Sequence, residues 1–267
     1  MQMVSVGDVS LHIRVDGPED GPPVVFANSL GTDLRLWDPI LPYLPEGLRI
    51  IRFDKRGHGL SSCPSSPYSM GALVSDTERL LDHLGVKNSV VVGLSIGGMI
   101  AQGLAVKRLD LVRALVLSNT AVKIGTSDMW AERIAGVRQG GIEALADQIM
   151  ERWFSAKFRT QPELELWRNM LTRQEDEGYI GCSAAISGTD FKSPTSGLRL
   201  PALGIAGSED GSTPPDMVRE TIDLIPGSRF ELIRNAGHLP CVEQPEIYAT
   251  ILTDFLRSVG HVPEGMT

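Results

Sequence analysis

An apolar strand pattern that breaks at a glycine-flanked serine constrains this chain more than any other feature of its sequence. The run Ser89-Val90-Val91-Val92 leads into Gly93-Leu94-Ser95-Ile96-Gly97, and a helix-compatible segment continues to Lys107. This pattern predicts a sharp strand-to-helix turn with Ser95 at its tip, since a backbone turned so tightly has no room for side chains beside the serine. The Ser95 hydroxyl would then stand above the amino end of a helix, whose dipole favours developing negative charge.

Short apolar runs alternate with helical patterns on both sides of this turn. Runs typical of buried parallel strands occur at 23–27, 49–53, 112–118, 201–207 and 229–233, and helical patterns occur at 70–84, 215–225 and 245–259. The alternation predicts an α/β fold with a doubly wound, mostly parallel sheet. Period-two alternation at 4–6 and 10–15 predicts an antiparallel hairpin at the sheet edge, with His12 as a surface residue.

The pattern changes between 123 and 193, where helical periodicity runs without intervening strands. Helices are expected at 129–137, 142–154, 163–171 and 179–186, separated by Gly140-Gly141, Pro162 and Gly178. We interpret 123–193 as an all-helical cap inserted into a core domain made of 1–122 and 194–267.

Charge and cysteine content limit the function classes. With 267 residues, 42% of them hydrophobic, the chain can bury a large core. A formal net charge of -8 argues against nucleic acid and anionic membrane surfaces as partners, so an anionic substrate would need locally placed cations. The three cysteines are far apart and lack metal-ligand spacing. The amino terminus lacks the pattern of a signal peptide, and we expect a reducing cytoplasm.

The run at 90–106 is apolar enough to imitate a membrane span. Ser95, Gln102 and several glycines interrupt it. A buried strand followed by a buried helix is therefore the better interpretation.

Two polar loops downstream carry candidate partners for Ser95. Asp210 follows the run at 201–207, and His238 follows the run at 229–233. Both are thus expected at the carboxyl ends of parallel strands, the edge that also carries Ser95. A serine nucleophile needs a base within hydrogen-bond reach and a third group that orients this base. The order serine, aspartate, histidine is one of the known chain orders of such triads.

Each candidate also has a plain structural interpretation. Asp210 alone could be a turn aspartate, and His238 alone could cap a helix. Glu209 competes as the triad acid, although the register favours Asp210. The segment 54–61 holds Asp, Arg and His together, but we interpret it as a structural support beneath the site.

Along its whole length the chain resembles the α/β-hydrolase superfamily, and within it the 3-oxoadipate enol-lactonases of aromatic-compound catabolism, the β-ketoadipate pathway. The serine turn and the triad are common to the superfamily. The histidine loop at 235–240 has the generic superfamily form. Further matching segments are 28–38, 54–59, 118–121 and Gly178-Tyr179. The narrower resemblance rests on the loop Asn28-Ser29-Leu30-Gly31-Thr32-Asp33 and on the cap residues Trp130, Arg133 and Arg152-Trp153-Phe154.

The resemblance implies a serine hydrolase that opens the ring of 3-oxoadipate enol-lactone to give 3-oxoadipate, without a metal or an organic cofactor. It also implies an oxyanion hole made by the backbone N–H groups of Leu30 and Ile96. A capped carboxylesterase or a carbon–carbon bond hydrolase stays open as an alternative, because these enzymes share the triad. A ligand-binding protein with a silent triad is disfavoured by the intact Ser95, Asp210 and His238.

The implied lactone carries a carboxylate, so its pocket needs a cation. The cap offers Arg133, Arg138, Arg152, Lys157, Arg159, Arg168 and Arg173. Arg133 can share a helix face with an apolar anchor, and we predict that Arg133 binds the carboxylate while Trp153 walls the ring. The partner is thus a small anionic lactone, and the sequence leaves a homo-oligomer possible.

Overall fold

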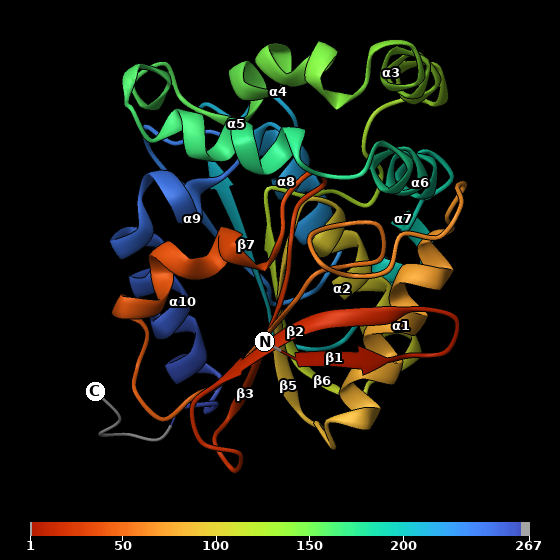
Figure 1. Ribbon diagram of the computed structural model, residues 1–267. Helices are drawn as coiled ribbons and strands as arrows, with labels where there is room; N and C mark the ends of the chain where they lie inside the picture. The colour runs from red at the N-terminus through yellow and green to blue at the C-terminus, as the bar shows by residue number, and fades with distance from the viewer. Residues whose placement is uncertain (1, 263–267) are drawn as a thin grey trace.

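The computed structural model describes residues 2–262, and a twisted sheet of eight strands forms its centre (Figure 1). The strand order is β1-β2-β4-β3-β5-β6-β7-β8. The strands are β1 (Gln2–Ser5), β2 (Ser10–Asp16), β3 (Pro23–Ala27), β4 (Arg49–Phe53), β5 (Ser89–Leu94), β6 (Val112–Ser118), β7 (Ala202–Gly207) and β8 (Arg229–Ile233). Strands β1 and β2 pair antiparallel at one edge, and all pairs from β4 to β8 are parallel. The predicted mostly parallel sheet and edge hairpin are confirmed.

Helices cover both faces of this sheet. α1 (Met70–His83) and α2 (Ile96–Lys107) pack together on one face, whereas α10 (Pro245–Ser258) packs on the other with η1 (Leu34–Tyr43) (Figure 1). The helix α8 (Pro215–Ile222) contacts β7, and the short α9 (Pro240–Glu243) precedes α10. The 3₁₀ helix η1 was not anticipated, because Pro39 and Pro42 inside it hide any α-helical signal.

The strand β5 lies in the middle of the sheet, between β3 and β6. Every residue of β5 is buried, and Val90, Val91 and Val92 are completely inaccessible. The apolar run at 90–106 is therefore a buried strand and a buried helix, as predicted. No helix within the described residues is long and apolar enough to cross a membrane.

The chain between β6 and β7 forms a helical layer along one end of the sheet, at the top of Figure 1. Its elements are α3 (Ser127–Gly140), η2 (Ile142–Leu145), α4 (Ala146–Trp153), η3 (Phe158–Thr160), α5 (Leu164–Thr172) and α6 (Asp176–Ser187). The short α7 (Lys192–Ser196) follows and packs against α2. The expected helices lie where the periodicity placed them. The division into a core and a cap domain at 123–193 stays a prediction.

The expectation that His12 is a surface residue is wrong. His12 is buried, and its Nδ1 lies 2.7 Å from Asp54 Oδ2. The reason is tertiary: the loop after β4 folds back over β2, so that Ser61 Oγ accepts from the His12 backbone N–H at 2.8 Å. Alternation along a single strand cannot reveal such a cover.

Candidate active site

The predicted turn after β5 places Ser95 at the tip of a strained backbone. Ser95 has φ 59° and ψ -119°, a conformation that a non-glycine residue rarely adopts. A Cβ at Gly97 would lie 2.0 Å from the carbonyl oxygen of Ala27, and one at Gly93 would lie 2.3 Å from that of Gly97. Both glycines are therefore required by the close approach of β5, α2 and β3.

Neighbouring groups hold the Ser95 backbone in this conformation. Its N–H donates to the carbonyl of Ser118, at 3.0 Å, and its carbonyl accepts from Thr120 Oγ1 at 2.6 Å. Both partners belong to the end of β6 or to the loop that follows it. The adjacent strand thus fixes the turn from the side.

Asp210 and His238 lie side by side in the loops after β7 and β8. His238 Nδ1 is 2.9 Å from Asp210 Oδ2, and both side chains are almost fully buried. The other oxygen, Asp210 Oδ1, accepts from the backbone N–H groups of Ser212, at 2.6 Å, and Thr213, at 3.0 Å. This arrangement leaves Oδ2 facing the imidazole.

Several donors keep the Asp210 carboxyl ionised. Burial by itself would raise the pKa of Asp210, but His238 and the hydrogen bonds from Asn119 and Thr213 outweigh it and lower this pKa below its ordinary value. Asn119 Nδ2 and Thr213 Oγ1 each donate to Oδ2 at 2.8 Å. Sequence reasoning missed both roles, although Asn119 lies in a segment that carries the family resemblance.

The competing acid, Glu209, points elsewhere. It is exposed, and its Oε2 accepts from the backbone N–H of Ala156 at 3.4 Å. A second glutamate, Glu243 of α9, braces the histidine loop by accepting from the backbone N–H of Gly237 at 2.6 Å. His238 N–H donates to the carbonyl of Trp153 at 2.8 Å, which ties this loop to the end of α4.

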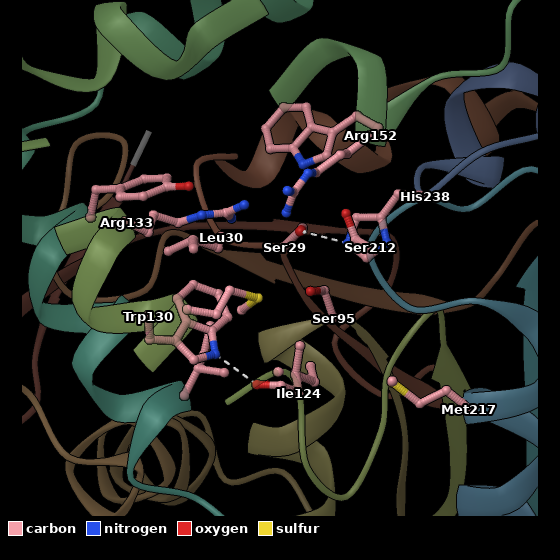
Figure 2. Close-up of a pocket in the computed structure, with 15 residues that line it drawn as sticks. Ser29, Leu30, Ser95, Ile124, Trp130, Arg133, Arg152, Ser212, Met217 and His238 are labelled. Atoms are coloured by element: carbon pink, nitrogen blue, oxygen red, sulfur yellow. Dashed lines mark hydrogen bonds between the residues drawn. The ribbon is translucent and has the colours of Figure 1, made fainter. Parts of the chain in front are cut away.

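The second ring nitrogen of His238, Nε2, faces the cavity that Ser95 also lines (Figure 2). His238 Nε2 lies 3.5 Å from Ser29 Oγ, so Ser29 is a further neighbour of the imidazole. Ser95 retains 7% of its accessible surface, which is consistent with a hydroxyl open to a small ligand. Hydrogen bonds of a catalytic serine often tighten only once substrate binds.

A tight turn after β3 presents the backbone of Leu30. Thr32 N–H donates to the carbonyl of Ser29 at 3.3 Å, and Gly31 has φ +78°, as the third position of a type II turn requires. Leu30 occupies the second position, whose N–H the turn does not use. Leu30 lines the cavity with Ser95, and Ile96 begins α2 directly after the serine.

The cavity has a volume of about 120 Å³ and lies between the sheet edge and the helical layer. The layer contributes two arginines and two tryptophans: Arg133, Arg152, Trp130 and Trp153. Figure 2 shows the guanidinium groups of Arg133 and Arg152 directed toward one another across the pocket. The Arg133 guanidinium also lies 5.2 Å from the ring centroid of Trp130.

These two arginines lack an anionic partner among the described residues, whose ion pairs include neither of them. Burial and the nearby charge of Arg133 lower the pKa of Arg152. Of the other candidate cations, Arg168 pairs with Glu143 and Asp147, and the remaining four are exposed: Arg138, Lys157, Arg159 and Arg173. The structure thus brings Arg133 and Trp153 to the pocket, and it adds Arg152.

The pocket also contains residues to which the sequence analysis gave no site role: Ile124, Met129, Tyr179, Ser212 and Met217. Of these, Met129 and Tyr179 lie in cap segments that the sequence analysis had singled out. Within residues 2–262, His, Cys, Asp and Glu side chains form no group of three that could hold a metal ion.

Comparison with known proteins gives this geometry a context. The family described as alpha/beta hydrolase fold matches residues 22–140. The chain is 34% identical to 3-oxoadipate enol-lactonase 2 of Acinetobacter baylyi, over 90% of this chain and 91% of that protein. The crystal structure of the enol-lactonase from Burkholderia xenovorans LB400 superposes with a TM-score of 0.92 at 34% identity, covering 96% of this chain and all of that one. A thermophilic esterase from Thermogutta terrifontis superposes with a TM-score of 0.91 at 28% identity, covering 98% of this chain and all of that one.

Proposed function

This chain belongs to the alpha/beta hydrolase family, and from that premise we propose that it opens the ring of 3-oxoadipate enol-lactone, with Ser95 as nucleophile. The observation that carries the proposal is the cavity itself, which joins Ser95 and His238 at the sheet edge to two arginines of the helical layer that form no ion pair within residues 2–262. Relatives named enol-lactonases match nearly the whole chain, the helical layer included. The product would be 3-oxoadipate, an intermediate of aromatic-compound catabolism.

The first half-reaction transfers the acyl group to the enzyme. His238 Nε2 removes the proton of Ser95 Oγ, which attacks the lactone carbonyl, while Asp210 holds the imidazole and stabilises its charged form. The backbone N–H groups of Leu30 and Ile96 stabilise the oxyanion. The C–O bond of the ring then breaks, and the enolate, which stays attached to the acyl group, takes the proton that His238 holds and becomes a ketone.

The second half-reaction releases the product. A water molecule gives its proton to His238 and attacks the acyl carbon, again through an oxyanion held at Leu30 and Ile96. The bond to Ser95 Oγ breaks, and His238 returns the proton to this oxygen. The newly formed carboxylate then leaves.

The two arginines favour a substrate that is itself an anion. Burying a carboxylate without a partner is costly, whereas a charge-assisted bond to a guanidinium is strong. Two guanidinium groups that face each other, without a carboxylate of the described chain between them, leave a place for one from the substrate. The small cavity favours a compact lactone over a long-chain ester.

The test compares a carboxylated and a neutral substrate. Arg133→Ala is expected to lower kcat/KM for the enol-lactone roughly 10- to 150-fold, chiefly by raising KM. This loss corresponds to about 1.5 to 3 kcal/mol, the contribution of a charge-assisted hydrogen bond. Hydrolysis of a neutral phenyl ester should change little. Arg138→Ala is the matched control, because Arg138 is exposed on the same helix, α3.

Equal losses on both substrates would mean that Arg133 supports the helical layer instead of binding the carboxylate. A wild-type protein that hydrolyses phenyl esters and leaves the enol-lactone intact would favour the alternative, a capped carboxylesterase. The structural similarity to the Thermogutta terrifontis esterase is the observation that favours this alternative.

A further inference from the structure

The segment after β4 does more than support the site from below. Its second residue, Lys55, is 2% exposed, and its Nζ donates to the carbonyl of Ser29 at 2.6 Å and to that of Thr32 at 3.2 Å. A buried ammonium group is costly, so its presence needs an explanation. Both of its acceptors belong to the turn that presents Leu30.

The peptide group between Ser29 and Leu30 explains the arrangement. A trans peptide is planar, and its C=O and N–H point in opposite directions. The hydrogen bond from Lys55 to the Ser29 carbonyl therefore fixes the direction of the Leu30 N–H as well. Because Leu30 lines the cavity with Ser95, this N–H is the one that the proposed mechanism assigns to the oxyanion.

A second side chain of the same segment fixes the next peptide group. His58 Nε2 accepts from the backbone N–H of Gly31 at 2.9 Å. Burial and the charge of Lys55 lower the pKa of His58 well below its ordinary value, which keeps this ring neutral and able to accept. Leu30 is thus held on both sides by residues that are not among those lining the cavity.

The positive charge of Lys55 contributes as well as the position of its ammonium group. An ammonium group bound to a carbonyl oxygen polarises the whole peptide unit and makes its N–H a stronger donor, and low surrounding polarity increases this effect. The geometry points to Lys55 as a positioning residue that acts through the Ser29–Leu30 peptide to strengthen the oxyanion hole. This inference rests on the serine-hydrolase part of the proposed function, and it does not depend on which ester is cleaved.

If the charge of Lys55 strengthens the oxyanion hole, kcat should decrease at alkaline pH. Burial lowers the pKa of Lys55 to about 8, against the raising effects of Cys182, Asp54 and Asp33. His58 is the other titratable group beside it. Lys55 is therefore charged at neutral pH and loses its proton as the pH rises above about 8. The kcat should fall over the same range.

The experiment replaces the ammonium by an apolar chain of similar length. Lys55→Met is expected to lower kcat for a neutral phenyl ester at pH 7 by roughly 10- to 100-fold, somewhat less than removing an oxyanion donor outright, with KM nearly unchanged. The alkaline fall in kcat should also disappear in this variant. Lys55→Arg, which keeps the charge, should recover part of the rate, and Lys87→Met is the control at an exposed lysine.

A Lys55→Met variant with wild-type kcat, or one that keeps the alkaline fall, would overturn the inference. If this variant does not fold, the wild-type profile decides, because a kcat that stays level from pH 7 to beyond pH 9 contradicts a role for the ammonium. Failure of the lactone proposal can be told apart from failure of this inference. If the lactone proposal is wrong, the wild type cleaves the phenyl ester but not the lactone, and the comparison between the wild type and Lys55→Met is still made on the ester.

Discussion

Replacing Asp210 by Asn tests the triad most sharply, because the structure dictates how the new amide must sit. Asp210 Oδ1 accepts from two backbone N–H groups, those of Ser212 and Thr213. These backbone donors cannot turn away, whereas the side chains of Asn119 and Thr213 that donate to Oδ2 can rotate, so the amide oxygen of Asn must stay at the place of Oδ1. The NH₂ group is then forced into the place of Oδ2, where it faces His238 Nδ1.

The forced orientation changes the tautomer of His238. An NH₂ group can only donate, so Nδ1 becomes an acceptor and the ring proton moves to Nε2. An Nε2 that already carries a proton cannot take one from Ser95. In other triads the equivalent change costs about four orders of magnitude in kcat, which corresponds to about 5 kcal/mol of transition-state stabilisation.

The assay is kcat for a phenyl ester and for the enol-lactone, with circular dichroism to establish that Asp210→Asn is folded. Glu209→Gln is the matched control, since Glu209 is the adjacent acid and is exposed. We expect this control to lie within a few-fold of the wild type. An Asp210→Asn variant within about tenfold of the wild type, or a larger loss in Glu209→Gln, would refute the reasoning.

Two further predictions concern the triad and Lys55. Ser95→Ala and His238→Ala should each lower kcat by roughly a millionfold, and the double variant should be little worse, because the two groups act as a unit. A fluorophosphonate should label the wild type and not Ser95→Ala. Strong residual turnover in Ser95→Ala would contradict the role of Ser95 as nucleophile. Lys55 should also make stability depend on pH. Its pKa is about 8 in the folded chain, below the ordinary 10.5, so the unfolded chain binds more protons between these two pH values. The free energy of unfolding should therefore increase as the pH rises from about 8 to 10.5. In chemical denaturation, the free energy of unfolding of the wild type should therefore rise by up to about 3 kcal/mol relative to that of Lys55→Met between pH 8 and pH 10.5; a difference between the two that does not change with pH would contradict the shift.

Local pattern was enough to predict the fold and the positions of the main candidates. The turn at Ser95 is encoded within about ten residues, because a buried strand, two glycines and a helix follow one another directly. Asp210 and His238 could be placed at the same edge because the carboxyl ends of parallel strands meet there. The cap helices were likewise visible from their own periodicity.

What the sequence left open are contacts between residues far apart in the chain. No pattern around His12 reveals that the loop after β4 covers it, and none around Asn119 reveals that its amide meets Asp210. Two of the seven candidate cations considered in the cap, Arg133 and Arg152, face the cavity, because the path of α3 and α4 over the sheet edge decides which faces point inward.

Lys55 shows the difference most clearly. Its neighbours in the sequence indicated only a polar support loop, and that interpretation agrees with where the loop lies. Its contact with the Ser29 carbonyl spans 26 residues and exists only because β3 and β4 are adjacent in the sheet. The sequence by itself determined which residues could do chemistry, because turns and periodicity are local; the tertiary structure alone decided which buried groups direct their charge and hydrogen bonds at the reacting centre, because direction and burial depend on the packing of distant segments.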